Sequence, residues 1–378
     1  MLNSTFVGLD VHKDTITIAR ANGYIGDVKI YGTINNNFKS LKKVLLKFND
    51  PEHLKVCYEA GPCGYSIYRQ LTNIGVECKV AAPSLIPRTP GNRVKTDRRD
   101  AKKLTSLFRS NELSFVWVPD KNSEALRDLI RARESAVQDL TRAKNRIKQF
   151  LLRYNIFPPQ NINPWTVVYR QWLDKIKFEF ETQYFVFREY VQAYDYAKLK
   201  VERFDKTVED HSKTCSQADF INALKAFRGI KTITAATIAC EIGDVRRFPH
   251  PRSIMAYLGT VPSEHSSGNT RHQGSITKTG NAHLRRVIVE ACWHYRYEPK
   301  VSYSLNKRQK GVSPKIKDIS WRTQVRLNKK YRRLLGRGKP KQVVITALAR
   351  ELIAFIWEAG YQVSIEQNVK NSNNENIA

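Results

Sequence analysis

The heptapeptide TFVGLDV at residues 5–11 is a short apolar run that ends on a carboxylate, Asp10. A second run of the same kind, LKVCYEA at residues 54–60, ends on Glu59. Both runs have the length and the β-branched or aromatic content of buried strands. We therefore expect Asp10 and Glu59 to stand at the ends of two strands.

A third segment, KTDRRDA at residues 95–101, carries Asp97 and Asp100 at the start of a helical pattern. Their spacing of three places both carboxylates on one face of a helix, so they can converge with the two strand-end acids. Converging carboxylates repel one another unless hard cations neutralise them, and Mg²⁺ (or Mn²⁺) takes oxygen ligands of this kind. Two such ions roughly 3.5–4 Å apart can hold the attacking and leaving oxygens of a phosphodiester exchange. The four acids therefore predict a catalytic metal site.

The segments around these acids predict a mixed α/β domain. Alternating and periodic apolar residues indicate three strands, a helix, a strand, a helix, a strand and a helix, over residues 5–11, 14–21, 25–34, 37–48, 54–59, 64–74, 76–81 and 97–110. The order βββαβαβα is that of the RNase H/RuvC-like fold, with a mixed five-stranded sheet. It places the acids on the first strand, the fourth strand and the last helix.

The balance of charge indicates a polyanionic partner. The chain has 64 Lys and Arg against 35 Asp and Glu, a formal net charge of +29. Such a charge attracts nucleic acid, and 41% hydrophobic residues exclude a disordered basic tail. Six scattered cysteines predict reduced thiols rather than zinc sites or disulfides. We expect no signal peptide and no membrane span.

The length of 378 residues predicts two or three domains. Near-heptad apolar spacing over 122–154 and an aromatic-rich stretch over 165–213 predict an antiparallel helical arm or a dimerising coiled coil. A helix, a Gly-Ile-Lys turn and a second helix over 223–236 predict a helix-hairpin-helix-like unit. The expected parts are a RuvC-like catalytic domain, a coiled-coil domain, a mainly α C-terminal domain and a disordered tail, over residues 1–118, 119–215, 216–365 and 366–378.

A second chemical centre is a polar, glycine-punctuated loop over 263–280, which contains the tripeptide Ser266-Ser267-Gly268. A serine beside a glycine and among guanidinium groups can attack phosphorus, although such a tripeptide is more often a plain turn. Residues 307–341 are strongly basic, which favours contact with a nucleic-acid backbone over a solvated loop. The residues predicted to bind nucleic acid are Arg271, Lys278, Arg285, Arg286, Lys329, Lys330, Arg332 and Arg333.

Seven motifs, in this order along the chain, resemble those of the DEDD transposases of bacterial insertion sequences, the group that includes Piv-type DNA invertases and RNA-guided bridge recombinases. They are GLDVHK, YEAGPCGY, KTDRRDAKKL, CEIGDVRRF, YLGTVP, SSG and KTGN, starting at residues 8, 58, 95, 240, 257, 266 and 278. The resemblance covers about 300 residues.

The resemblance implies a site-specific recombinase that cuts and exchanges double-stranded DNA at the element ends and at the target. It gives Asp10, Glu59, Asp97 and Asp100 the metal-binding roles. Ser267, directly before the glycine, takes the role of a nucleophile that forms a phosphoserine in the C-terminal transposase domain, and Ser266 is its neighbouring alternative. The resemblance also implies a dimer or tetramer with a shared site, a noncoding guide RNA from the element, and a place at the nucleoid in the bacterial cytoplasm.

Four other functions compete with this interpretation. A RuvC-like, Holliday-junction type endonuclease would use water and only the N-terminal domain. A tyrosine recombinase is suggested by the HxxR spacing of His283 and Arg286 near Tyr295, Tyr297 and Tyr303, but it leaves the four acids without a role. An actin-like sugar kinase lacks its second phosphate loop here. A non-catalytic nucleic-acid-binding protein would need only the charge.

Overall fold

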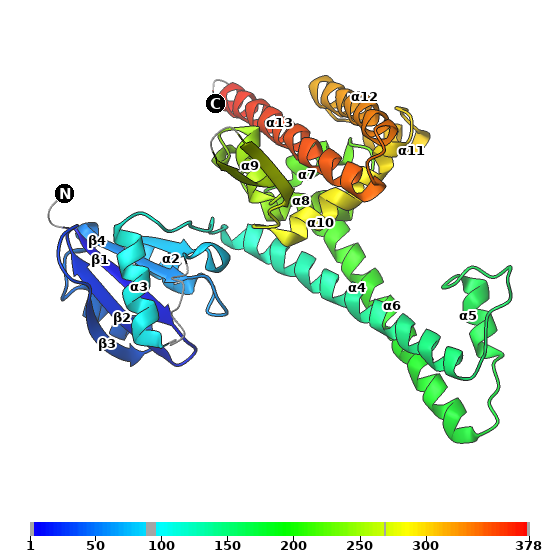
Figure 1. The fold of residues 1–378 in the computed structure, drawn as a ribbon, viewed down its shortest axis with the longest axis horizontal. Helices are drawn as coiled ribbons and strands as arrows, with labels where there is room; N and C mark the ends of the chain where they lie inside the picture. Colours follow the sequence, from blue (N-terminus) through cyan, green and yellow to red (C-terminus); the bar gives the residue numbers. More distant parts are fainter. Residues whose placement is uncertain (1–3, 88–95, 268–269, 376–378) are drawn as a thin grey trace. The chain divides into compact units, whose positions relative to one another are not determined.

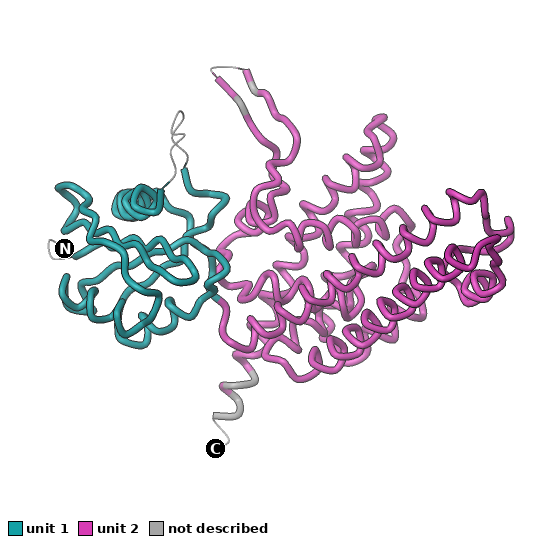
Figure 2. Tube along the Cα trace, turned by 90° about the horizontal axis from the view of Figure 1, so that it is seen from below, with its two compact units in different colours: residues 1–118 teal, residues 119–378 magenta. Residues whose placement is uncertain are grey.

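The computed structural model describes residues 4–87, 96–267 and 270–375. The chain divides into two compact units, Met1–Val118 and Pro119–Ala378 (Figure 2). The first unit is an α/β domain and the second is mainly helical (Figure 1). These findings confirm the predicted mixed five-stranded sheet and the mainly helical second part.

The first unit is built on a five-stranded sheet in the order β3-β2-β1-β4-β5. Its first three strands form an antiparallel meander, and its last two run parallel to β1. The strands are β1 (Thr5–Val11), β2 (Thr15–Asn22), β3 (Lys29–Asn35), β4 (Leu54–Glu59) and β5 (Glu77–Ala81). Strand β1 lies between β2 and β4, and helices cover both of its faces, which explains its unbroken apolar sequence.

Helices cover the two faces of this sheet differently. Val7 and Leu9 of β1 belong to a core with α1 (Phe38–Leu45) and α2 (Ser66–Asn73). Phe6 belongs to a separate core with α3 (Asp97–Arg109). Successive side chains of a strand point to opposite faces, so even-numbered residues of β1 face α3.

In the second unit, α4 (Lys121–Arg153) and α6 (Glu181–His211) pack side by side (Figure 1). Arg133 pairs with Asp205, and farther along α4 the ring of Phe150 stacks on that of Phe187. The residue number of the α6 partner falls as that of the α4 residue rises, so the two helices are antiparallel. Of the two forms that the sequence allowed, the chain by itself therefore forms an arm. Helix α5 (Val167–Asp174) packs on this arm through Tyr169, within the same aromatic core.

The rest of the second unit is a helical core to which the largely buried helix α8 and one face of α13 contribute. Figure 1 shows its helices. Its helices are α7 (Ala218–Lys225), α8 (Thr232–Ile242), α9 (Pro251–Tyr257), α10 (Ala282–Cys292), α11 (Tyr303–Arg308), α12 (Pro314–Gly336) and α13 (Lys341–Glu375). Short 3₁₀ helices lie at Pro51–His53, Pro83–Leu85, Val245–Arg247 and Trp293–Arg296. None of the described helices is long and apolar enough to cross a membrane.

The structure differs from the expected elements in three places. Strand β3 begins at Lys29 rather than at residue 25, because Gly23 and Gly26 both adopt positive φ and lengthen the connection. The polar segment 263–280 is largely a two-stranded hairpin, β6 (Pro262–Ser267) and β7 (Thr270–Ile276), rather than a loop. An exposed two-stranded ribbon buries no apolar face, so it leaves no apolar alternation in the sequence. Helix α13 continues to Glu375, into the predicted tail, and residues 376–378 lie outside the described residues.

Candidate active site

The acidic cluster forms where the end of β1 meets the first turn of α3. Asp10 has the same parity along β1 as Phe6, which packs on α3, so its side chain points to the α3 face. Glu59 likewise has the parity of Cys57, whose Sγ lies 3.8 Å from Leu104 O of α3. Alternation along two neighbouring strands therefore directs both strand-end acids to the same face of the sheet.

Helix α3 approaches β1 unusually closely, because Gly8 has no side chain. A Cβ placed on Gly8 would lie 2.5 Å from Thr105 Oγ1 and 2.7 Å from Ala101 O. The Thr105 hydroxyl is itself held, since it donates to Ala101 O at 2.8 Å and to Ala19 O of β2 at 3.2 Å. This contact, two residues before Asp10, determines how near the first turn of α3 comes to the end of β1.

The N-terminus of α3 is capped by Thr96, whose hydroxyl accepts from Arg99 N at 3.4 Å. The cap places Asp97 and Asp100 in the first turn. Unpaired amides and the helix dipole favour negative charge there. The helix start thus lowers the free energy of holding two carboxylates beside a third.

Three potential ligand atoms meet in this cluster. The closest atoms of Asp10, His12 and Asp97 all lie within 4.8 Å of one another. His12 Nε2 is 3.4 Å from Asp10 Oδ2 and 3.5 Å from Asp97 Oδ1. Burial raises the pKa of Asp10 and His12 lowers it, but the charges of Asp97 and Asp100 add to the effect of burial, so the pKa is raised.

Glu59 and Asp100 stand farther from the centre of the cluster. Leu9 pairs with Tyr58 in the β1–β4 register, so Glu59 is the strand neighbour of Asp10. Among the described residues, neither Glu59 nor Asp100 belongs to the group of ligand atoms formed by Asp10, His12 and Asp97. The sequence interpretation did not include His12. The sequence feature that could have indicated His12 is its position two residues after Asp10, on the same side of the extended chain.

The donor set fits a divalent cation. Asp10 Oδ2 is buried and has no hydrogen-bond partner among the described residues, although it lies within ion-pair distance of His12. A buried carboxylate oxygen without a donor is costly, and a hard cation would satisfy it. Carboxylates with one imidazole are ordinary ligands of such ions.

The two candidate serines are the last two residues of β6, and both are exposed. Ser266 Oγ lies 3.0 Å from Glu264 Oε1, to which it donates. The hydroxyl of Ser267 has no hydrogen bond to a described residue, and its carbonyl accepts from Thr270 Oγ1 at 2.8 Å. The two hydroxyls therefore differ, because that of Ser266 is engaged by a carboxylate. Gly268 lies outside the described residues.

The basic residues near this hairpin have different surroundings. Lys278 is exposed. Arg285 donates from Nη1 to Leu258 O at 2.9 Å, and Arg286 pairs with Glu134 at 2.8 Å. Arg271 lies in β7, but its side chain is outside the described part of the structure. Arg285 and Arg286 thus already have partners within the second unit.

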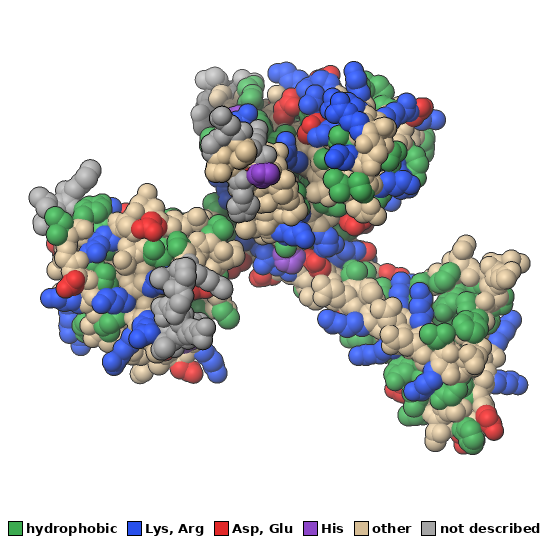
Figure 3. All heavy atoms as spheres, in the orientation of Figure 1, with side chains coloured by type: hydrophobic (Ala, Val, Ile, Leu, Met, Phe, Trp, Pro, Cys, Tyr) green, Lys and Arg blue, Asp and Glu red, His purple; other side chains and the backbone are tan. Residues whose placement is uncertain are grey.

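The basic stretch 307–341 is mostly helix α12, and Lys and Arg side chains gather over it (Figure 3). Lys329 and Arg333 are exposed and have no ion-pair partner among the described residues. Lys330 donates to Ala347 O and pairs with Glu351 at 2.8 Å, and Arg332 pairs with Glu298. Of the four residues predicted to bind nucleic acid here, two therefore have free cationic groups and two are paired within the fold.

Comparisons with known proteins identify the family to which the chain belongs. A DEDD transposase model of the IS110 type matches residues 7–156, and a model described as "Transposase IS116/IS110/IS902 family" matches residues 221–303. A putative transposase of Sinorhizobium fredii is 41% identical over 93% of this chain and 87% of its own length. The transposase for insertion sequence element IS1533 of Leptospira borgpetersenii is 30% identical over 90% of this chain and 99% of its own. The transposase for IS1328 of Yersinia enterocolitica is 24% identical over 78% and 85%. The chain therefore belongs to the IS110/IS116 family of DEDD transposases, enzymes that catalyse DNA strand transfer.

Proposed function

We propose that this transposase exchanges strands between double-stranded DNA at the ends of an insertion sequence and at its target. In this proposal the first unit is a RuvC-like domain that holds Mg²⁺ (or Mn²⁺) through Asp10, Glu59, Asp97 and Asp100. The supporting observation is the buried Asp10 Oδ2, which lacks a hydrogen-bond donor and faces a second carboxylate. His12, between Asp10 and Asp97, is a further candidate ligand. The bound cation would offset the negative charge of the phosphate and of the developing alkoxide.

Ser267 is the nucleophile in this proposal. Its exposed hydroxyl makes no hydrogen bond to a described residue, whereas that of Ser266 is bonded to Glu264. Attack by Ser267 Oγ, whose hydroxyl gives up its proton, forms an Oγ–P bond and breaks one P–O bond of the DNA strand, and the departing strand oxygen takes up a proton. The hydroxyl of the incoming strand then displaces the serine. Because the phosphate stays esterified throughout, the strands are rejoined without an external source of energy.

The active site is shared between protomers in this proposal, so that one protomer contributes the acids and another the serine. The chain would then be at least a dimer. Part of the α4–α6 arm supports such an assembly, because Phe185, Tyr196 and Leu199 of α6 are exposed in the single chain. Large apolar side chains gathered on one helix are typical of an interface.

Nucleic acid lies along helix α12 in this proposal. Lys329 and Arg333 have free cationic groups, and Trp321, which is 44% exposed, stands on the same helix. These three residues line a groove of about 610 Å³, together with Arg326 and Phe355. Cations beside an exposed aromatic ring suit a phosphate backbone and an unstacked base.

Three further expectations stay predictions. The element would encode a noncoding RNA that guides the choice of DNA, and RNA that copurifies with the protein would test this. The second unit would consist of a coiled-coil domain over 119–215 and a transposase domain over 216–365. The protein would act at the nucleoid.

One experiment separates these functions. A strand-exchange reaction with Mg²⁺ compares the wild type with Asp10→Asn, Ser267→Ala and Ser266→Ala, and the covalent DNA–protein adduct is mapped by mass spectrometry. If the proposal holds, Asp10→Asn does not cleave DNA and Ser267→Ala forms no adduct. Ser266→Ala both cleaves DNA and forms the adduct. Cleavage without an adduct in Ser267→Ala would support an endonuclease that uses water.

An adduct on a tyrosine would instead support a tyrosine recombinase. Tyr295 is 1% exposed, and burial raises the pKa of its phenol well above the usual range. Of the three tyrosines near the HxxR motif, only Tyr297 and Tyr303 are exposed to a substrate.

A mixing experiment tests the shared site. Neither Asp10→Asn nor Ser267→Ala is active alone if the proposal holds. A mixed dimer joins the intact acids of one variant with the intact serine of the other, so mixing restores exchange when the site is shared. Mixing restores nothing when each chain uses its own serine.

A further inference from the structure

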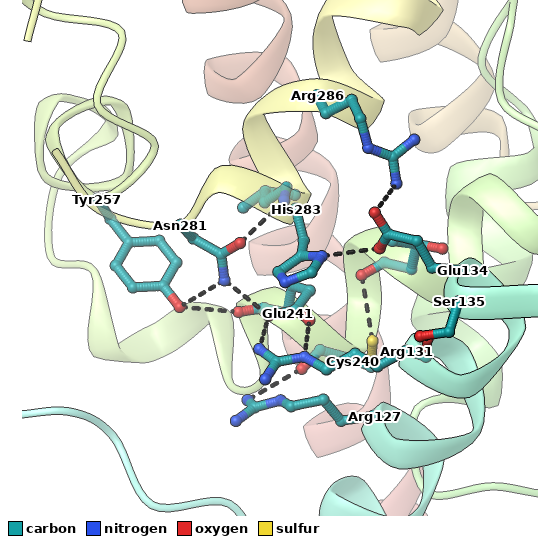
Figure 4. Close-up of polar contacts among 12 residues, drawn as sticks. Arg127, Arg131, Glu134, Ser135, Cys240, Glu241, Tyr257, Asn281, His283 and Arg286 are labelled. Atoms are coloured by element: carbon teal, nitrogen blue, oxygen red, sulfur yellow. Dashed lines mark hydrogen bonds and ion pairs between the residues drawn. The ribbon is translucent and has the colours of Figure 1, made fainter. Parts of the chain in front are cut away.

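A buried carboxylate, that of Glu241, lies among polar side chains of α4, α9 and α10 (Figure 4). Glu241, in the last turn of α8, is 1% exposed. Arg131 of α4 donates to both of its oxygens, from Nε to Oε1 at 3.0 Å and from Nη2 to Oε2 at 3.2 Å. Asn281 donates from Nδ2 to Oε2 at 2.7 Å. Burial raises the pKa of Glu241, but these hydrogen bonds outweigh it, so the pKa lies below its ordinary value.

Asn281 connects this carboxylate to the chain that leaves the hairpin. It is the N-cap of α10, where its Oδ1 accepts from Leu284 N at 2.9 Å. Its backbone N–H donates to Tyr257 O at 3.0 Å, and its Nδ2 also lies 3.3 Å from the Tyr257 hydroxyl. That hydroxyl donates to Glu241 O at 3.1 Å. One side chain thus links α8, α9 and α10 at the end of the hairpin.

Backbone hydrogen bonds and two closely packed glycines hold the base of the hairpin. Thr277 N donates to Val261 O at 2.9 Å, and Lys278 N donates to Gly259 O at 3.1 Å. Gly259 and Gly280 both have positive φ, and a Cβ on either would come within 2.2 Å of a backbone oxygen. Substitution at either glycine would therefore displace the base.

The second carboxylate in this region strengthens the same connection. Glu134 of α4 pairs with His283 Nδ1 at 2.7 Å and with Arg286 Nη2 at 2.8 Å. Both partners lie in the first turns of α10, directly after Asn281. Helix α4 therefore holds the start of α10 through the contact of Glu134 with His283 and its ion pair with Arg286.

A small rotation at the base of the hairpin produces a larger displacement of the serines, because they lie at its far end. Five residue steps separate Pro262 from Ser267, which at about 3.3 Å per residue is about 17 Å. A tilt of about 4° at the base would move Ser267 by about 1 Å, and a misplacement of that size can slow a reaction by about 100-fold. The stiffness of the base therefore decides whether the serine hydroxyl reaches phosphorus in line.

We propose that Glu241, Arg131 and Asn281 are positioning residues that hold the base of the β6–β7 hairpin and so aim Ser267 at the DNA. This inference rests on the proposed role of Ser267. It explains why a carboxylate is retained inside an otherwise apolar helical core, where an apolar side chain would usually cost less free energy. It also predicts a defect confined to the reaction of the serine, with DNA binding unchanged.

The test exchanges the carboxylate of Glu241 and the amide of Asn281 between the two positions. Asn281→Asp keeps the volume and the N-cap acceptor, because Asp caps helices as well as Asn does. It replaces the donor that faces Glu241 by a second carboxylate oxygen. We expect adduct formation on pre-bound DNA to slow by about 100-fold, and the amides of 277–281 to exchange hydrogen faster. The double variant Glu241→Gln with Asn281→Asp returns a donor to the pair and should recover at least a factor of about ten over Asn281→Asp alone.

Asn222→Asp is the matched control, because it makes the same charge change at an exposed position of helix α7 and should leave both measurements unchanged. Wild-type adduct rates in folded Asn281→Asp would overturn the inference. So would faster hydrogen exchange throughout the second unit together with no recovery in the double variant, which would indicate a merely structural role. The failure of the proposed function is distinguishable from this outcome. An adduct that still forms in Ser267→Ala would show that Ser267 is not the nucleophile, whatever happens at the hairpin base.

Discussion

Gly8→Ala should separate the two segments that form the acidic cluster. A Cβ on Gly8 would lie 2.5 Å from Thr105 Oγ1 and 2.7 Å from both Ala101 O and Thr105 N, whereas ordinary contacts begin at 3.4 Å. Two of these three atoms are backbone atoms of α3, and the third is held by two hydrogen bonds. Rotation of one side chain therefore cannot remove the clash.

The helix itself must move. The shortfall of 0.7–0.9 Å, the difference between 3.4 Å and the contacts of 2.7 and 2.5 Å, is the displacement of α3 from β1 that removes the clash. Overpacking of this kind costs about 1–3 kcal/mol of stability. Because Asp97 and Asp100 move with the helix while Asp10 stays on the strand, cleavage should fall by about 100-fold.

Three measurements check this prediction: denaturant unfolding, Mn²⁺ binding followed by electron paramagnetic resonance, and DNA cleavage across a range of metal concentrations. We expect lower stability, weaker Mn²⁺ binding and slower cleavage. Gly61→Ala is the control, because its Cβ would have its nearest described neighbour, Glu59 O, at 3.9 Å. Unchanged Mn²⁺ binding and cleavage in Gly8→Ala would refute the argument that this contact brings the acids together.

Three further predictions concern other parts of the chain. Replacing Lys329 and Arg333 by Gln should reduce the slope of log affinity against log salt by about 1.8 on duplex DNA, at about 0.9 per phosphate contact, and an unchanged slope would place α12 away from the DNA. The lowered pKa of Glu241 means that its ionised form stabilises the fold above its ordinary pKa of 4.5, and that this contribution is lost as the pH falls through the folded pKa. Acid unfolding should therefore be less steep in Glu241→Gln than in the wild type. Phe187→Ala, at a fully buried site in the α4–α6 arm, should cost about 3–5 kcal/mol in denaturant unfolding, and a smaller loss would indicate that the arm is loosely packed.

The competing functions differ in what they require of the second unit. A water-using endonuclease needs the acidic cluster alone, so it would be indifferent to changes at the hairpin base. A serine recombinase needs both centres, and its covalent step should respond to Asn281→Asp while its metal binding does not. The two perturbations, at Gly8 and at Asn281, therefore report on the two centres independently.

Local patterns in the sequence were sufficient to predict the first unit. The runs that end at Asp10 and Glu59 became central strands, and the helix that begins at Asp97 carries its two acids in the first turn. These elements could be predicted because strand and helix periods, caps and turns depend on residues close together in the chain. The long helix over 122–154 was predictable for the same reason, and it runs from Lys121 to Arg153.

Only the tertiary structure decided which side chains meet. His12 joined the acidic cluster because α3 covers one face of the sheet, and nothing near His12 in sequence specifies that face. The β6–β7 hairpin buries no apolar face, so no period marks it in the sequence. Glu241 lies in the motif CEIGDVRRF, but its partners Arg131 and Asn281 are 110 and 40 residues away in the sequence. Contacts between distant segments depend on how whole elements pack, and that information is not contained in any single stretch of sequence.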